Sequence, residues 1–386
     1  MTRSLRLPAA DGSLYEWKPS GKPPIEPEPG GFVSRVAYAA AHVVADPLAD
    51  SSDASPAIDW EATLQFRRHL WSLGLGVAEA MDTAQRGMGL DWAAAQRLIA
   101  ASVGEAKDTG ALLVCGAATD QLVPGPSIGL GDVMEAYRQQ VEFVEGAGGR
   151  VMLMASRSLA ACAASADDYL EVYGRLVSEA ASPVMIHWLG EMFDPALAGY
   201  WGSPDPWKAL ETVLELVRQH PGRIEGVKIS LLDDELEVAL RRGLPSGVRV
   251  YTGDDFNYVE LILGDDQGHS DALLGAFDAI APAAAAALQA LDAGKVDRYR
   301  GILEPTLPLA RHVFSAPTFH YKTGVVFLAY LNGHQTHFRM VGGAESSRSV
   351  PHLANILVLA DRAGLLRDPD LAVHRMRSVL ELAGVP

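Results

Sequence analysis

Lys228 stands in an apolar segment, Ile224 to Ser230, whose composition predicts a buried β-strand. Most of the other lysines lie in polar, loop-like or helix-surface contexts. Burial of an ammonium group is costly, so a lysine in such a place tends to lose its proton. A neutral amine attacks carbonyl groups, whereas the guanidinium of arginine stays charged and does not. Lys228 is therefore a candidate nucleophile; the alternative is a strand-end lysine whose ammonium group reaches water.

Polar residues also follow several other apolar runs, at the point where each run ends. They are Asp82, Thr83 and Arg86 after the run that begins at Val77, His187 and Glu191 at and after the run from Val184, and Gly253, Asp254 and Asp255 after the run from Arg249. His187 suits general acid–base catalysis because an unperturbed imidazole has a pKa of about 6.5. The alternative for His187 is a buried ring that is hydrogen-bonded to backbone.

The other members of this set suit the binding of a substrate. The hydroxyl of Thr83 fits a substrate oxygen or an ordinary turn. Arg86 and Arg157 each offer a cation to an acidic substrate. The turn that begins at Gly253 carries Asp254 and Asp255, which fit hydrogen bonds to substrate hydroxyls or the capping of the next helix.

The elements that must position these residues alternate between short apolar runs and amphipathic helical stretches. Eight runs predict strands, at Val33–Ala40, Val77–Met81, Ala111–Cys115, Val151–Met154, Val184–Trp188, Gly226–Ile229, Arg249–Thr252 and Ala272–Ala276. Eight strands that alternate with helices predict a parallel sheet closed into a (β/α)8 TIM barrel. In that fold the active site lies at the C-terminal ends of the strands, which is where the polar residues above fall.

Segments outside the eight repeats predict two extensions of the barrel. Residues 1–30 contain two short apolar runs around Asp11-Gly12, followed by a Pro-rich linker, and predict an appended β-hairpin. Residues 31–282 form the predicted barrel. Residues 283–386 are largely helical in pattern and predict a C-terminal extension that packs on the barrel.

Composition narrows the class of protein. The chain has 386 residues and a formal net charge of −16, which argues against nucleic acid or an anionic membrane as a partner. The N-terminus lacks the apolar stretch of a signal peptide, and no apolar run is long enough to cross a bilayer. The two cysteines, Cys115 and Cys162, stand in apolar or Ala-rich runs and predict no disulfide framework. We therefore expect a cytoplasmic protein that acts on a small molecule.

The order of these segments resembles one family. Gly226-Val227-Lys228-Ile229-Ser230 is similar to the Schiff-base lysine strand of the dihydrodipicolinate synthase and N-acetylneuraminate lyase family. Further similarities follow in the family's order: Ile58-Asp59-Trp60 upstream, then Val250 to Asp255, Ile262-Leu263-Gly264, Gly268 to Leu273, Ala281-Pro282 and the helical segments up to Lys322. The resemblance spans roughly residues 31–345 and rests on order and spacing. It implies a class I aldolase that forms an imine at Lys228, requires no organic cofactor, and assembles as a homodimer or homotetramer.

The chain departs from this family where the substrate is recognised. The family's Gly-Thr-Thr-Gly-Glu-like loop is replaced by Asp82 to Arg86, which keeps one threonine. Alignment on Pro183 brings His187 to the position of the proton-relaying tyrosine, and Met192 to that of the arginine just beyond. Ala155-Ser156-Arg157 stands where the family has a tyrosine pair. These differences indicate a divergent branch that keeps the lysine.

The sequence thus predicts a Schiff-base lyase or aldolase that acts on a keto acid or a sugar-like carbonyl compound, with Lys228 as nucleophile and His187 as proton shuttle. Two alternatives remain open. One is a metal-dependent barrel aldolase or isomerase with ligands among His42, Asp82, His187 and Glu191. The other is a non-catalytic descendant that binds a sugar-like metabolite.

Overall fold

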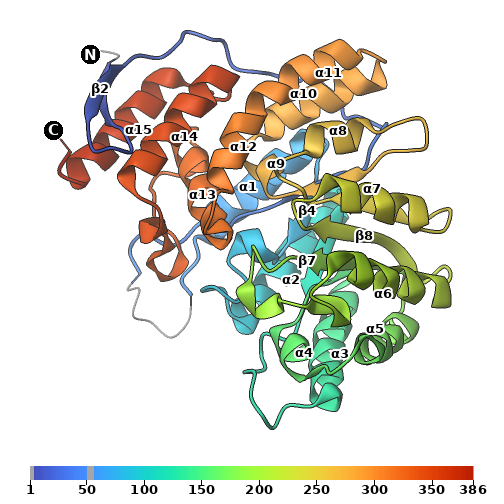
Figure 1. The fold of residues 1–386 in the computed structure, drawn as a ribbon. Coiled ribbons are helices and arrows are strands. Elements are labelled where there is room, and N and C mark those ends of the chain that lie inside the picture. Colours follow the sequence, from blue (N-terminus) through green and yellow to red (C-terminus); the bar gives the residue numbers. More distant parts are fainter. Residues whose placement is uncertain (1–3, 50–55, 386) are drawn as a thin grey trace. The chain divides into compact units, whose positions relative to one another are not determined.

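Eight parallel strands close into a barrel (Figure 1). The computed structural model describes residues 4–49 and 56–385. Around the barrel the order is β10-β3-β4-β5-β6-β7-β8-β9, so β10 pairs with β3 and closes the sheet. The strands are β3 (Ala37–Ala40), β4 (Gly76–Glu79), β5 (Leu113–Ala117), β6 (Arg150–Leu153), β7 (Val184–Leu189), β8 (Ile224–Ser230), β9 (Arg249–Thr252) and β10 (Asp271–Leu274). The predicted TIM barrel is confirmed.

One residue in two along the strands points inward and fills the barrel. The buried inner cluster includes Tyr38, Val114, Met152, Tyr251 and Leu273, which come from five different strands. The strands are buried on their outer faces as well, because helices cover the sheet. This double burial explains why the strands read in the sequence as continuous apolar runs.

The helices of the barrel unit follow the strands in alternation. They are α2 (Trp92–Thr109), α3 (Leu130–Ala147), α4 (Arg157–Cys162), α5 (Ala166–Glu179), α6 (Pro206–Gln219), α7 (Asp234–Gly243) and α8 (Tyr258–Leu263), with short 3-10 helices η1 (Asp82–Ala84), η2 (Pro195–Leu197) and η3 (Tyr200–Gly202) in the loops. Aspartates cap several of them: Asp91 accepts from the backbone N–H of Ala94 and so starts α2. Such caps make the helix starts easy to predict.

A second unit contains the N-terminal hairpin and the C-terminal helices. Its strands β1 (Leu5–Pro8) and β2 (Leu14–Trp17) pair antiparallel, and Gly12 adopts φ 81° in the turn between them, which confirms the predicted hairpin. Its helices are α1 (Trp60–Ser72), α9 (Ala276–Ala279), α10 (Ala281–Asp292), α11 (Val296–Leu303), α12 (Leu307–Val313), α13 (Tyr321–Leu331), α14 (Val350–Ala363) and α15 (Pro369–Leu382), with 3-10 helices η4 (Glu304–Thr306), η5 (Thr318–His320) and η6 (Val341–Ser347). Every residue of α13 is buried, so it is the central helix of this unit.

The predicted start of the first barrel strand was wrong. The first barrel strand begins at Ala37 and not at Val33, whose side chain is 91% exposed and whose N–H donates to Asp292. In the C-terminal segment, which the sequence predicts to be largely helical, residues 296–313 are divided into α11, η4 and α12, because Pro305 and Pro308 each remove a backbone donor.

Contacts divide the chain into these two units. The barrel unit comprises residues 35–41 and 76–274, and the other unit comprises residues 1–34, 42–75 and 275–386.

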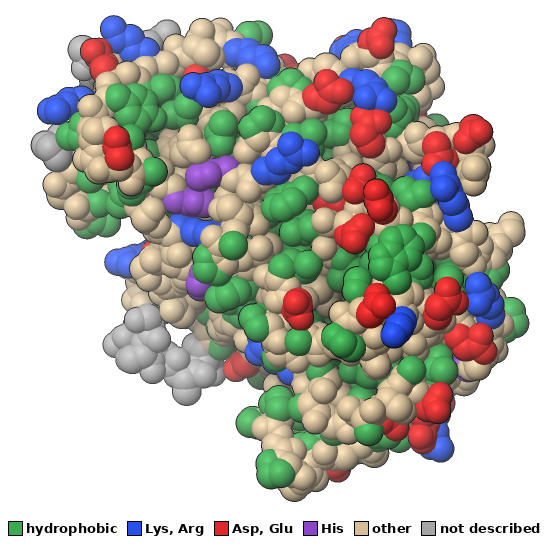
Figure 2. Space-filling model, in the orientation of Figure 1, with side chains coloured by type: hydrophobic (Ala, Val, Ile, Leu, Met, Phe, Trp, Pro, Cys, Tyr) green, Lys and Arg blue, Asp and Glu red, His purple; other side chains and the backbone are tan. Residues whose placement is uncertain are grey.

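Within the described part of the chain, no helix combines the length and apolar character needed to cross a membrane. Lys and Arg side chains are interspersed with Asp and Glu side chains on the face shown in Figure 2. The described residues of that face therefore form no continuous basic surface.

Candidate active site

Lys228 lies on the inner face of β8, near the C-terminal end of the strand. In the parallel register it stands beside His187 of β7 and Tyr251 of β9. Alternation along β8 puts Gly226, Lys228 and Ser230 on one face. A Cβ atom on Gly226 would lie 2.7 Å from the Tyr251 ring, so the glycine makes room for that ring next to Lys228 along the strand. The lysine is therefore positioned by two flanking strands.

The amine of Lys228 is buried, and the charges of two carboxylates act on it. The side chain is 6% exposed. Burial lowers the pKa of Lys228 below its ordinary value, while the charges of Asp82 and Asp255 act in the opposite direction. The net direction is downward, so a larger fraction of the amine is unprotonated near neutral pH than in an exposed lysine. This is the form that attacks a carbonyl.

His187 is fully buried beside this amine. Burial lowers the pKa of His187 well below that of a free imidazole, and the charge of Lys228 lowers it further. Its Nε2 lies 3.2 Å from Oγ of Ser230, whereas Nδ1 has no hydrogen-bond partner and lies 3.8 Å from Oδ2 of Asp82. A neutral imidazole with one unengaged nitrogen is suited to take a proton from a bound molecule.

The Gly253 turn packs directly against Lys228. A Cβ atom at position 253 would lie 2.1 Å from Oγ of Ser230 and 3.0 Å from Cε of Lys228. The N–H of Gly253 also donates to the carbonyl of Ile229 at 2.8 Å. The position therefore requires glycine for close approach, and the turn brings Asp255 into the field of the amine.

A buried glutamate on α7 holds the start of this turn. Glu237 is 1% exposed and accepts hydrogen bonds from Thr252 at 2.9 Å and Ser270 at 2.7 Å. Burial raises its pKa to about 8 despite these two bonds, so the carboxyl group is largely protonated at neutral pH. Oγ1 of Thr252 in turn accepts from the N–H of Asp254, whose carboxylate bonds the backbone of Phe256 and Asn257. Asp254 therefore shapes the turn.

Arg86 lies next to the strand-β4 loop but is fully engaged by protein. Its guanidinium makes two 2.7 Å bonds to Asp120 and a 2.6 Å bond to Gln140. The remaining donors reach the carbonyls of Ala80 and Gly116. Because a guanidinium has five N–H groups, this arrangement leaves none for a substrate.

Three further predicted residues lie around the loops at the C-terminal ends of the strands. Thr83 is buried within η1. Arg157 is half-exposed and pairs with Asp194 at 2.6 Å. Glu191 is exposed and borders a cavity of about 230 Å³, whose apolar wall includes Trp188 and Leu231.

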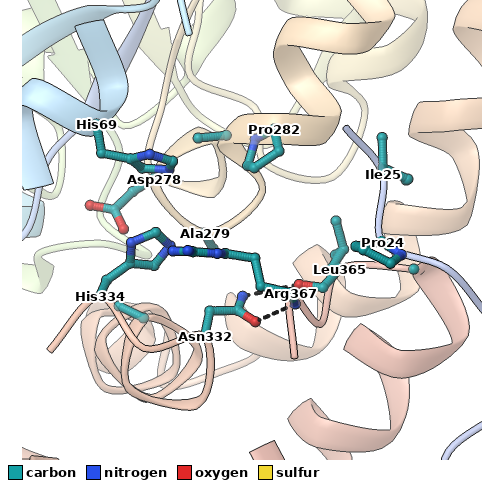
Figure 3. A pocket seen from close by; sticks show the side chains of 13 residues that line it. Pro24, Ile25, His69, Asp278, Ala279, Pro282, Asn332, His334, Leu365 and Arg367 are labelled. Atoms are coloured by element: carbon teal, nitrogen blue, oxygen red, sulfur yellow. Dashed lines mark hydrogen bonds between the residues drawn. The ribbon is translucent and has the colours of Figure 1, made fainter. Parts of the chain in front are cut away.

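His42 belongs to the other unit, where it forms a buried pair with Asp278. Its Nδ1 lies 2.9 Å from the Asp278 carboxylate, and its Nε2 lies 3.2 Å from Gln335. Asp278 also borders a cavity of about 20 Å³ with His69, His334 and other residues (Figure 3). Burial lowers the pKa of His334 to about 3, and the charges of His69 and Arg367 add to this effect, so the ring is neutral. The cavity of about 20 Å³ beside Asp278 is large enough for one water-sized group.

The four residues of the metal-dependent alternative are thus spread over different surroundings. His42 is held by Asp278, and Glu191 borders an outer cavity, while Asp82 and His187 lie near Lys228. Among the residues that the structure describes, no three His, Cys, Asp or Glu side chains are grouped so that they could hold a metal ion.

Comparison with solved structures defines the class of fold. The barrel resembles YagE, a prophage protein of the dihydrodipicolinic acid synthase family from E. coli K12 in complex with pyruvate, with a TM-score of 0.64, 11% identity, and coverage of 91% of this chain and 99% of that chain. A structure described as the first monomeric dihydrodipicolinate synthase variant has a TM-score of 0.64 at 14% identity, covering 86% and 98% of the two chains. A chloride-inhibited dihydrodipicolinate synthase from Acinetobacter baumannii with pyruvate has a TM-score of 0.63 at 13% identity, covering 86% and 100%. The resemblance that the sequence predicts is confirmed in the fold.

The chain belongs to a protein family of unknown function, DUF993, whose model matches residues 5–385. A search of curated proteins returns no match. The dihydrodipicolinate synthase likeness at this identity therefore describes the fold, and the chemistry must be inferred from the side chains.

Sequence reasoning missed two residues of the site. Ser230 stands two positions after Lys228, so strand alternation places both on one face; this signal was available. Glu237 occurs in an acidic helix start that reads as solvent-exposed, yet it follows Leu236 directly and stands three residues before Leu240. That helical spacing puts it in the apolar stripe of α7.

Proposed function

We propose that the protein is a class I aldolase-type lyase, in which the amine of Lys228 forms a Schiff base with a small carbonyl compound. The observation that carries this proposal is the buried amine on the inner face of β8, with a lowered pKa and a neutral imidazole beside it. The dihydrodipicolinate synthase fold supports it as an analogy, because in TIM barrels the chemistry takes place at this end of the strands.

The chemistry follows from the properties of an iminium ion. Attack of Nζ on the carbonyl carbon and loss of water leaves a positively charged C=N group. This group accepts the electron pair of a breaking bond at the adjacent carbon, so carbon–carbon cleavage, its reversal or loss of water becomes feasible. The lysine supplies the electron sink, and the proposed reaction requires no organic cofactor.

His187 is proposed to move the protons that this sequence requires. Its lowered pKa keeps the ring neutral, so one nitrogen carries a proton and the other accepts one. Ser230 lies 3.2 Å from Nε2 and fixes the ring, while Nδ1 is unengaged. The imidazole ring is fixed by Ser230 and still has one nitrogen without a hydrogen bond. Such a ring can transfer a proton between the bound molecule and Asp82.

Borohydride trapping tests the proposal. The protein is incubated with a mixed panel of 2-keto acids, hydroxyketones and aldehydes, reduced with borohydride, and examined by intact mass and peptide mapping. We expect one covalent adduct per chain, on the peptide that contains Lys228. Reduction without a carbonyl compound controls for other modifications.

Variants separate specific from general amine reactivity. Lys228→Arg keeps a positive charge but cannot form the imine, so the adduct should disappear. The matched control is Lys208→Arg on the exposed surface of α6, which should leave the adduct unchanged. If no compound in the panel adds mass to the native protein, or if Lys228→Arg is labelled as well as wild type, the proposed function is wrong.

A further inference from the structure

We infer that the carbonyl compound bound at Lys228 is an uncharged, hydroxylated ketone or aldehyde, and not a 2-keto acid. This inference rests on the proposed function and concerns the same site. It follows from the charges around the amine, from the bonding of the arginines in the strand-end loops and from the hydrogen-bonding character of the side chains near the amine.

The charged groups that act on Lys228 within the barrel unit are carboxylates. Asp82 lies 3.8 Å from His187, the strand neighbour of Lys228, and Asp255 belongs to the Gly253 turn that packs against Lys228; both carboxylates raise the pKa of the amine against the effect of burial. The iminium ion is a permanent cation, so these two carboxylates stabilise it. A 2-keto acid would add a third negative group next to the same cation, in a buried place where like charges repel most strongly.

A 2-keto acid needs a cation to bind its carboxylate, but the guanidinium of Arg86 is fully bonded to other protein groups. All five N–H groups of Arg86 are bonded to Asp120, Gln140 and two backbone carbonyls. Releasing this guanidinium would leave the Asp120 carboxylate, which is 17% exposed, without its cationic partner. Arg157 pairs with Asp194 and is 45% exposed, so its charge is screened by water.

The polar atoms near Lys228 suit hydroxyl groups instead. The carboxylate of Asp82 accepts hydrogen bonds, and a substrate hydroxyl is the neutral group that donates them. Nδ1 of the fully buried His187 has no partner and faces Asp82 at 3.8 Å, so a hydroxyl placed there would meet both an imidazole and a carboxylate. The alcohol that loses its proton in a retro-aldol step requires a base, and either group of this pair can act as one.

The proposed reaction balances as follows. The lone pair of Nζ forms a C–N bond to the carbonyl carbon, and the oxygen leaves as water with one proton from Nζ and one from a general acid. A hydroxyl on the carbon β to the iminium then gives its proton to His187 or Asp82. The bond between the α and β carbons breaks, its electron pair moves toward the iminium nitrogen to give an enamine, and an aldehyde leaves. Protonation of the enamine and addition of water release the second product and restore the amine.

The test compares two carbonyl probes of similar size, dihydroxyacetone and pyruvate, each trapped separately on the native protein with cyanoborohydride. At equal concentration we expect labelling of Lys228 by dihydroxyacetone to exceed labelling by pyruvate about tenfold or more, the range in which one nearby carboxylate shifts an equilibrium. Excess acetate should not diminish the dihydroxyacetone adduct. Lys208→Arg serves as the control for background labelling.

The outcomes are distinguishable. Preferential labelling of Lys228 by dihydroxyacetone supports both proposals. Equal or preferential labelling by pyruvate keeps the Schiff-base function and overturns the substrate class; if that labelling is lost in Arg157→Met, Arg157 is the anion-binding group. Labelling by neither probe, while circular dichroism shows a folded protein, contradicts the proposed function and this inference with it.

Asp82→Asn provides a second check: removal of one carboxylate should raise the pyruvate adduct relative to the dihydroxyacetone adduct, and an unchanged ratio would contradict the electrostatic basis of the inference.

Discussion

Replacement of Glu237 by glutamine should remove a large pH dependence of stability. Burial raises the pKa of this carboxyl group from 4.5 to about 8 in the folded protein. The folded state therefore holds a proton that the unfolded chain has already lost between these two pH values. Folding is favoured at low pH, and its free energy decreases as pH rises through this window.

The magnitude follows from the shift. One pKa unit corresponds to about 1.4 kcal/mol, so the whole window represents about 5 kcal/mol and the interval from pH 6 to pH 8 about 2 kcal/mol, because the group is half ionised at pH 8. Glu237 is fully buried, so solvent does not screen this effect. In Glu237→Gln the neutral amide still bonds the hydroxyls of Thr252 and Ser270, and the group no longer titrates.

Urea unfolding at pH 6, 7, 8 and 9, followed by circular dichroism, provides the assay. The difference in unfolding free energy between variant and wild type should grow in favour of the variant by about 2 kcal/mol from pH 6 to pH 8 and then level off. An infrared carbonyl band of a protonated carboxylic acid should be present at pH 6 in wild type and missing in the variant. A difference in stability that does not change with pH would refute the reasoning, because Glu237 would then be ionised in the folded protein.

Three further substitutions test other contacts of the site. Arg86→Met should lower the free energy of unfolding by about 3–5 kcal/mol in a urea titration, because it removes the cationic partner of the largely buried Asp120 carboxylate; a loss below about 1 kcal/mol would mean that the network is dispensable. Gly253→Ala should abolish adduct formation at Lys228 and cost about 1–3 kcal/mol of stability, since its Cβ atom would clash within the turn; normal trapping would contradict the close approach. Asp82→Asn removes a charge that raises the pKa of Lys228, so the pH at which trapping reaches half its maximal rate should fall; an upward shift in the pH–rate profile would oppose this electrostatic role.

The fold was predictable because each repeat carries its own local signals. Strands such as Val184–Leu189 read as continuous apolar runs since both faces of the sheet are covered, and capping aspartates such as Asp91 mark helix starts. Lys228 could also be identified from a local signal, because it is an ionisable residue inside an apolar run.

The contacts of the site were not predictable, because they join segments that are distant in the chain. Arg86 reads as a free cation, and only the fold brings Asp120 and Gln140 to it from other segments. The pairing of His42 with Asp278 likewise joins residues 236 positions apart. Sequence spacing identifies which residues end a strand, but tertiary packing decides which of them is satisfied by protein and which faces a ligand.

The most direct measurement of the central claim compares two lysines in one sample. The protein is labelled with a single carbonyl compound and cyanoborohydride at pH values from 6 to 10, and the peptides that contain Lys228 and Lys208 are quantified by mass spectrometry. The buried amine should be labelled near pH 7, well below the pH at which labelling of the exposed Lys208 begins. If both peptides are labelled together and only at high pH, Lys228 is an ordinary protonated lysine and does not act as the proposed nucleophile.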